Sequence, residues 1–315
     1  MTSNHILFTV MATIWGLTWI AIKTGVEAVP PLFFAAARLL AAGSILLTLA
    51  SLRRLPLSIH GSLGRVVTIS ILVNTVTYGL LFWGMQHIPS GLASVLNLSL
   101  IPIGLFSIGL AAGEETYSSR KATAIAMGVL GLCVLFLPKL DFDGDSHALA
   151  GMGALVVGTL AYCWGSILSR PLLRTMAPAA LGGWLSIIGG IALLLLSIAL
   201  EPLGTATLAV FFTPPVVASW LFLVVCGSVI AFTLYLRLLR DWGPTRSGLY
   251  AFVSPIIAVV LGILIFHEPF GSYEIVGSAI MLTAAALALR SEPGPPDVIE
   301  APKAVRAAGM GSPRH

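Results

Sequence analysis

The residues of this chain that could do chemistry are neutral polar and aromatic side chains set within long hydrophobic segments. Asn74 and Tyr78 are four residues apart, which places them on one helix face. Amides and hydroxyls beside aromatic rings suit a small, partly apolar, zwitterionic solute, because the polar groups bind its charged ends and the rings stack on its side chain. The pattern predicts a solute-binding cavity. The residues expected to line it are Trp15, Trp19, Asn74, Tyr78, Ser94, Asn97, Tyr162, Trp164, Ser166, Ser247, Tyr250 and Ser254.

Individual members of this set have a competing structural interpretation. Serine and threonine in membrane helices often bond to their own backbone or hold two helices together. A tryptophan near the end of a membrane span often belongs to the interfacial belt. Asn74 and Asn97 are stronger candidates, because an amide at mid-span is costly when it faces lipid.

Two cations are candidate charge contacts. Lys23 lies near the end of a hydrophobic segment, from which its side chain could also extend to the membrane surface. Arg38 lies about seven residues, roughly 10 Å, into the next segment at 1.5 Å per residue. We expect Arg38 either to attract a substrate carboxylate or to pair with a backbone carbonyl.

Catalytic and metal-binding patterns are absent from the sequence. It contains no GxSxG, no HExxH and no intramembrane pair of aspartates, so we predict no enzymatic activity and no catalytic residue. Cys133, Cys163 and Cys226 all lie in hydrophobic segments without a CxxC spacing, which is typical of small buried side chains. We therefore expect no metal and no cofactor.

The composition defines the elements that position these residues. Of 315 residues, 57% are hydrophobic and 10% are charged, and the mean hydropathy is +0.98. These values exclude a cytosolic enzyme, a nucleic-acid-binding protein and a disordered scaffold. The apolar runs are continuous over about 20 residues, which favours membrane-spanning helices over a β-barrel. The sequence predicts an all-α integral membrane protein.

Ten transmembrane helices are expected, separated by short connections rich in proline and glycine. The first has no basic segment before it, so we interpret it as a retained helix and not as a cleaved signal peptide. Residues 291–315 are rich in proline, glycine and charge, and we predict a disordered tail. The predicted spans are approximately 6–24, 31–51, 65–87, 90–112, 119–138, 149–169, 178–200, 215–238, 244–266 and 272–290.

Basic residues predict the orientation in the membrane. Fourteen of the 17 Lys and Arg residues fall in one set of loops or in the tail, whereas only Lys23 and Lys139 fall in the opposite set. The excess marks the cytoplasmic side, so both termini are expected to be cytoplasmic, in the cytoplasmic (inner) membrane. The basic charge thus indicates topology, with membrane lipid as a partner and no nucleic acid. A monomer is the simplest expectation.

The two halves of the chain resemble each other at an offset of 153 residues. Pro102 is followed by Glu115, and Pro255 by Glu268, at the same spacing. A Trp-Gly pair also recurs, at Trp15 and Trp164, but at an offset of 149. Because each half holds five spans, the second copy enters the membrane inverted, an architecture common among secondary transporters. The units are 1–138, an extracytoplasmic acidic connector at 139–148, and 149–290.

The paired prolines and glutamates suggest moving and fixed points in this repeat. Pro102 and Pro255 lie near mid-span, where each would kink its helix, and we interpret them as hinges. Glu115 and Glu268 follow near opposite membrane faces, and we interpret them as pins or gates that cap neighbouring helices.

The segments "ATIWGLTWIAIK" at 12–23 and "FFAAARLLAAGSILL" at 33–47, together with the repeated proline and glutamate elements, resemble the drug/metabolite transporter superfamily. More narrowly, residues 5–290 resemble its EamA-type ten-helix branch, and most of all the bacterial aromatic amino acid exporters. The resemblance implies a 5+5 inverted repeat around a central cavity and export of amino acids, related metabolites or drugs. The second half departs from the pattern, because Ser169 and Arg170 stand where a counterpart of Lys23 would be expected.

The sequence therefore predicts an exporter of aromatic or neutral amino acids, or related small metabolites, that works by alternating access. With no carboxylate or histidine at mid-span, a uniporter or exchanger is favoured over proton coupling. Alternatives are a nucleotide-sugar or phosphate-ester carrier and a drug exporter of the same superfamily. An intramembrane enzyme is a more remote alternative. A channel is a further one, although no repeated filter-like segment is present.

Overall fold

The computed structural model describes residues 3–59, 61–85, 87, 90–137, 146–266 and 271–289. Within these residues the chain is helical and contains no strand. The helices of the first half are α1 (Ser3–Ala28), α2 (Pro31–Leu52), α3 (Leu63–Ser70), η1 (Ile71–Val76), α4 (Thr77–Met85), α5 (Ser90–Ala111) and α6 (Ser119–Phe136). Those of the second half are α7 (Ser146–Leu173), α8 (Pro178–Leu200), α9 (Thr205–Phe211), α10 (Pro214–Phe222), η3 (Leu223–Phe232), α11 (Thr233–Trp242), α12 (Pro244–Gly248), α13 (Tyr250–Phe266) and α14 (Ser272–Leu289).

Proline at the first helical position begins several of these helices. Pro31, Pro178, Pro214 and Pro244 open α2, α8, α10 and α12. At this position the missing N–H costs nothing and the fixed φ already suits the helix. Gly243 forms the turn between α11 and α12. Its φ of +84° is a backbone conformation that other residues rarely adopt. Proline and glycine thus mark where one span ends and the next begins.

The predicted spans are found with two differences. A continuous α3–η1–α4 rod and a continuous α10–η3–α11 rod each form one span, and each contains a π-helical segment that the sequence pattern did not reveal. A short helix, α9, also stands between α8 and α10, where a plain connection was expected. The predicted connector and tail lie mostly or wholly outside the described residues.

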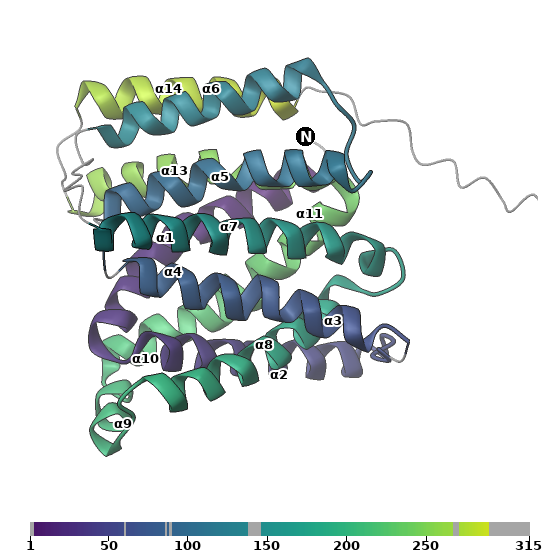
Figure 1. The fold of residues 1–315 in the computed structure, drawn as a ribbon, viewed down its shortest axis with the longest axis vertical. Helices are drawn as coiled ribbons and strands as arrows, with labels where there is room; N and C mark the ends of the chain where they lie inside the picture. The colour runs from purple at the N-terminus through teal and green to yellow at the C-terminus, as the bar shows by residue number, and fades with distance from the viewer. Residues whose placement is uncertain are drawn as a thin grey trace, which may run out of the picture.

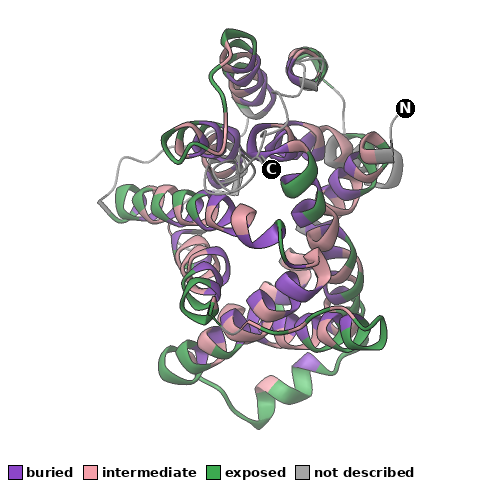
Figure 2. Ribbon diagram, turned by 90° about the vertical axis from the view of Figure 1, so that its right-hand side faces the viewer, coloured by how far each residue is buried: buried purple, intermediate pink, exposed green. Residues whose placement is uncertain are grey.

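Length and apolar composition identify this chain as a membrane protein. Five described helices are long and apolar enough to cross a bilayer, and shorter apolar helices accompany them at Leu96–Ala111 and Ile275–Ala288. Leucine, isoleucine and valine side chains are exposed on the outer faces, for example Leu195 and Ile198 on α8 and Leu282 on α14. Figure 2 shows exposed residues on the outer faces of the helices and buried ones turned inward. Such a surface needs lipid around it.

Helix packing repeats between the two halves. α2 packs on α8, and α6 packs on α14, so each pair joins equivalent helices of the two halves. α1 packs on α13 just as α7 packs on α5, and α1 contacts η3 as α7 contacts η1. Figure 1 shows α6 and α14 together at one edge of the bundle and α2 and α8 at the other. This reciprocal packing is what an inverted repeat of five plus five helices requires.

The backbones approach each other very closely in the two pairs of equivalent helices, α6 with α14 and α2 with α8. A Cβ atom at Gly131 would lie 2.9 Å from the carbonyl oxygen of Gly277, and one at Gly277 would lie 2.8 Å from the carbonyl oxygen of Gly131. On the other side of the bundle, a Cβ at Gly43 would lie 3.0 Å from the carbonyl oxygen of Gly183. Small residues let backbones approach in membranes, where packing replaces the hydrophobic effect between helices.

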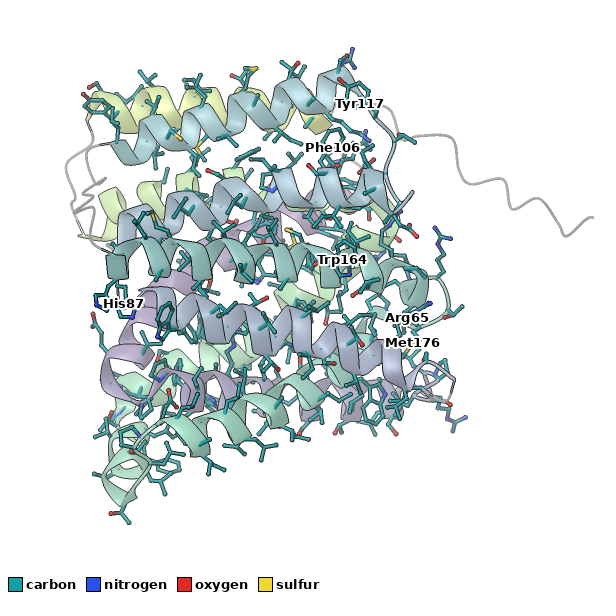
Figure 3. The ribbon with its side chains drawn as sticks, viewed as in Figure 1. Arg65, His87, Phe106, Tyr117, Trp164 and Met176 are labelled. Atoms are coloured by element: carbon teal, nitrogen blue, oxygen red, sulfur yellow. The ribbon has the colours of Figure 1, made fainter. Side chains whose placement is uncertain are left out.

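Basic side chains gather at one end of the bundle, which we call the basic end. Figure 3 shows Arg65 and Met176 at this end and His87 at the other. Described residues that lie at or beyond helix termini there are Arg53, Arg54, Arg65, Arg120, Lys121, Arg170, Arg174, Arg237, Arg240 and Arg246. The clustering agrees with the loop assignment from the sequence, although which face of the membrane this end occupies stays a prediction.

Candidate functional site

A cavity of about 170 Å³ lies between the two halves of the chain. Its walls come from α1, α2, η1, α4 and α5 in the first half and from α7, α8, η3 and α13 in the second. Among the described residues, none of α6 or α14 contributes to it, since these two helices pair at the edge of the bundle (Figure 1). The repeat therefore encloses the cavity with eight of its ten spans.

Trp15, Tyr162, Phe232 and Tyr250 line the cavity and form an aromatic wall. The rings of Trp15 and Tyr250 meet edge to face, with centroids 4.3 Å apart. Tyr235 lies behind them, almost fully buried, with its ring 5.4 Å from Trp15 and 5.9 Å from Tyr162. Offset and edge-to-face contacts of this kind hold rings in fixed orientations. The wall is thus a rigid surface on which a planar or apolar group can stack.

Two hydrogen bonds fix the aromatic wall in place. The Trp15 indole N–H donates to the carbonyl oxygen of Gly227 at 3.3 Å, which joins α1 to η3. The Tyr235 hydroxyl donates to Ser166 Oγ at 2.9 Å, which joins α11 to α7. The Tyr250 and Tyr162 hydroxyls are 3.4 Å apart, so they interact only weakly.

A polar wall of the same cavity is formed by Arg38, Asn74 and Tyr78. Asn74 is buried, and its amide nitrogen donates to the carbonyl oxygen of Leu185 on α8 at 2.8 Å. Thr77 also lines the cavity, with its hydroxyl 2.7 Å from the carbonyl oxygen of Leu72. These bonds connect the α3–η1–α4 rod to its own backbone and to the second half.

Arg38 is the charged residue among the described side chains that line the cavity. It is 8% exposed, its Nη2 donates to the Tyr78 hydroxyl, and its guanidinium carbon lies 4.9 Å from the centre of the Tyr78 ring. The ring face attracts the cation and the hydroxyl accepts one of its protons. Its Nε is buried without a hydrogen-bond partner.

Both π-helical segments face the cavity. η1 contributes Val73 and Asn74, whereas η3 contributes Gly227, Ser228 and Phe232. A π-helical turn widens the helix and disturbs its regular hydrogen bonding, and such turns occur frequently at functional sites. The carbonyl oxygen of Gly227, for example, accepts the bond from Trp15 described above.

At the basic end, the connection after α5 ties the two halves together. Glu115 accepts hydrogen bonds from Lys121 Nζ at 2.5 Å and from the backbone N–H of Thr245 on α12 at 3.2 Å. Burial raises the pKa of Glu115, but the bonds from Lys121 and Thr245 outweigh it and bring the pKa below its ordinary value. Its neighbour Glu114 pairs with Arg170 at 2.8 Å. The contacts with Thr245 and Arg170 cross from the first half to the second.

The structure brings eight of the predicted residues together around the cavity. They are Trp15, Arg38, Asn74, Tyr78, Asn97, Tyr162, Tyr250 and Ser254. Of these, Ser254 donates its hydroxyl to the carbonyl oxygen of Ala12 at 3.0 Å, so it also holds α13 against α1.

Three predicted residues lie elsewhere. Trp164 is 51% exposed on the outer face of α7 (Figure 3), because its helix turns that side away from the bundle. Ser166 is buried behind the aromatic wall, where it accepts the bond from Tyr235. Ser247 is buried and donates to the carbonyl oxygen of Gly243 at 2.8 Å, which makes it a structural residue of α12.

The misplacement of Trp164 comes from the offset of the repeat. A Cβ at Gly16 would lie 2.9 Å from the carbonyl oxygen of Ser254, and Cys163 Sγ lies 3.5 Å from the carbonyl oxygen of Ile101. Since Ile101 and Ser254 are repeat mates, Gly16 corresponds to Cys163, 147 positions later, and Trp15 corresponds to Tyr162. The Trp-Gly similarity at an offset of 149 is therefore two residues out of register.

The remaining predicted residues are only partly described. The side chains of Trp19, Lys23 and Ser94, and all of Glu268, lie outside the described part of the structure. Pro102 and Pro255 are buried inside α5 and α13, which continue through them. Their role as hinges stays a prediction.

Sequence reasoning missed several residues of the site. Thr18, Ser186 and Ser228 line the cavity, and Tyr235 supports the aromatic wall. The Ser186 hydroxyl is buried without a hydrogen-bond partner, a feature visible only in three dimensions. Thr18 could have been found, because it lies three residues after Trp15 on the same helix face.

The fold and cavity together define a polytopic helical membrane protein with an internal binding site between inverted halves. The sequence profile of the EamA-like transporter family matches residues 2–137 and 149–290. The chain therefore belongs to the EamA-like transporter family, within the drug/metabolite transporter superfamily, and it is a membrane transporter.

Several known proteins are similar over most of this chain. The transporter YoaV of Bacillus subtilis is 26% identical, covering 85% of this chain and 90% of its own. The inner membrane transporter YedA of Escherichia coli is 27% identical, covering 87% and 86%. A WAT1-related chloroplastic protein of Arabidopsis thaliana is 28% identical over 87% of this chain, which spans 66% of that longer protein.

A solved crystal structure also shares the fold. It superimposes with a TM-score of 0.74 and covers 91% of this chain and 97% of its own, at 18% sequence identity. At this identity the likeness concerns the arrangement of the helices alone.

Proposed function

We propose that this protein exports amino acids with aromatic or neutral side chains, or related small metabolites, across the cytoplasmic membrane by alternating access. The observation that carries the proposal is the cavity between the inverted halves, whose lining combines an aromatic cluster with a cluster of polar side chains. An aromatic surface in the same cavity as amide, hydroxyl and guanidinium groups suits a solute with one apolar and one polar part. The reciprocal helix packing supports a rocking motion about the site.

The described lining supports a uniporter or exchanger. It contains no carboxylate and no histidine, the groups through which proton relays inside membranes usually run. A carrier of nucleotide sugars or phosphate esters receives less support, because a multiply charged anion would require several cations and Arg38 is the one that the described lining provides.

Counterflow in proteoliposomes tests the proposal. Vesicles containing the purified protein are loaded with an unlabelled amino acid and diluted into the labelled one, without any ion gradient. Saturable accumulation, accelerated by the internal load, is the expected result. Its absence for all amino acids, even after proton and sodium gradients are imposed, would contradict the proposal.

A further inference from the structure

We propose that Arg38 is the docking point for a carboxylate, and that the carried compounds are monocarboxylates with an apolar or aromatic body whose amino group is dispensable. This inference rests on the proposed transport function and names the substrate class of the same cavity. It starts from a buried cation with unused hydrogen-bonding capacity.

The guanidinium of Arg38 is charged, buried and incompletely bonded. The residue is 8% exposed, and its Nε has no hydrogen-bond partner. An arginine keeps its charge inside proteins, so this donor cannot be relieved by loss of a proton. A buried donor without an acceptor is costly, and a buried charge without a counter-charge more so. A ligand with a negative oxygen would remove both costs at once.

Tyr78 fixes the direction in which Arg38 presents its free donor. The Tyr78 hydroxyl accepts one proton of Nη2, and the ring lies 4.9 Å from the guanidinium carbon. Nε–H and one N–H of Nη2 share one edge of the planar group. That edge matches the two oxygens of a carboxylate, which binds in a side-on, two-bond arrangement. Arg38 and Tyr78 both line the cavity, so the guanidinium stands at the cavity wall.

The charge balance of the described lining offers a charged partner to a carboxylate and none to an ammonium group. Arg38 supplies a positive charge, and no described lining residue supplies a negative one. An ammonium group entering the cavity would therefore meet only rings and neutral polar groups. Cation–π contacts contribute modestly compared with a charged hydrogen-bonding partner. The carboxylate thus determines recognition, and the amino group adds little.

The other polar and aromatic groups complete the site for such a compound. Trp15 and Tyr250 offer an edge-to-face pair of rings at 4.3 Å on which an apolar body can pack. Ser186 offers a buried, unpartnered hydroxyl in the same cavity, suited to a second polar substituent. One guanidinium matches one carboxylate, so the site selects monoanions.

Binding to the purified protein in detergent tests this inference, through the shift in melting temperature and the quenching of tryptophan fluorescence. The ligands are phenylpropionate, its neutral isostere phenylpropionamide, phenylalanine and phenylethylamine. We expect phenylpropionate and phenylalanine to bind with similar affinity. The amide and the amine are expected to bind at least about tenfold more weakly, because neither can form the charged pair.

Variants locate the effect at Arg38. Arg38→Gln is expected to lose the preference for the acid over the amide, whereas Arg38→Lys keeps the charge and part of the preference. Arg65→Gln removes an exposed arginine at the basic end and serves as the matched control, with affinities within about twofold of wild type. If Arg38→Gln does not fold, the wild-type comparison of acid with amide still decides the question.

The possible outcomes separate this inference from the proposed function. Equal binding of acid and amide, no binding of either acid, or an unchanged preference in folded Arg38→Gln would overturn the carboxylate site. Counterflow of the same compounds is measured in parallel. Acids that bind in an Arg38-dependent way but are never exchanged would refute transport and leave the binding site standing. Equal exchange of amides and acids would support transport and refute the carboxylate site.

Discussion

The two halves of this protein have equivalent helix packing, but they contribute different side chains to the cavity lining. α2 and α8 begin at prolines 147 positions apart, and their packing partners correspond. At the same offset, however, Arg38 corresponds to Leu185, which is buried. At the offset of 153, Asn74 corresponds to Gly227 and Tyr78 to Ala231.

This difference separates the requirement for motion from the requirement for binding. Alternating access needs two equivalent sets of helix contacts, so the small residues and helix-starting prolines recur. Recognition of an asymmetric solute needs different groups at its two ends. The first half therefore supplies the charge and the amide, and the second half supplies most of the aromatic wall.

The paired glutamates are expected to contribute unequally to stability. Glu115→Ala removes the partner of Lys121, whose side chain is 8% exposed, and leaves a buried cation unpaired. We expect the free energy of unfolding to fall by about 3 kcal/mol, measured by titration with denaturing detergent. The residue 153 positions after Lys121 is Glu274, so the sequence provides no basic partner for Glu268 at the corresponding position, and Glu268→Ala is expected to cost clearly less. Equal losses in the two variants would show that the ion pair is not the source of stability.

The same glutamate predicts a pH dependence at the basic end. Because its pKa in the folded protein lies below the ordinary value of 4.5, Glu115 contributes stability that is present above that value. This contribution disappears as the pH falls through the folded-state pKa. Melting temperatures measured from neutral to acidic pH should therefore converge for wild type and Glu115→Gln at the acidic end. A constant difference across the range would contradict this assignment.

Trp15 and Trp164 are expected to differ in their importance for transport. Trp15→Ala removes part of the aromatic wall and the bond to Gly227, and we expect the counterflow rate at low substrate concentration to fall about tenfold or more. Trp164→Ala, on the outer face, should stay within about twofold of wild type. If the two variants lost activity equally, the register of the repeat derived from Gly16 and Cys163 would be wrong.

The hydroxyl of Tyr250 is expected to contribute little to substrate affinity. Tyr250→Phe removes an oxygen 3.4 Å from the Tyr162 hydroxyl and leaves the ring in contact with Trp15. A bond of that length contributes little, so the affinity for a transported compound should change by less than about twofold. A tenfold loss in equilibrium binding would indicate that the hydroxyl contacts the substrate directly.

The sequence predicts the membrane spans and the repeat well, because a lipid bilayer constrains helix length and composition. Long apolar runs, prolines at helix starts and the offset of 153 located the spans and the repeat. The same reasoning could not locate η1 or η3, because a π-helical segment depends on packing and not on a residue pattern. It also mistook Trp164 for the mate of Trp15, since similar residues two positions away concealed the true register.

Site residues were predicted correctly where the helix face alone determines whether a side chain reaches the cavity. They were missed where this depends on tertiary contacts. Asn74 and Tyr78 share a face, and both reach the cavity. Ser186 and Tyr235 depend on the rotation of α8 and α11 against their neighbours, which no periodicity reveals. Ser247 matched its mate in sequence, yet it bonds within its own short helix.

Alternating access is tested most directly by the accessibility of the cavity from each side of the membrane. Cys133, Cys163 and Cys226 are replaced by alanine, and a single cysteine is placed at Ser228, which lines the cavity in η3. Proteoliposomes are then treated with a membrane-impermeant thiol reagent from outside or from inside. If access to this cavity alternates, the cysteine is labelled from both sides, and a transported compound slows the labelling in each case. Labelling from one side only, unaffected by any transported compound, would contradict alternating access through this cavity.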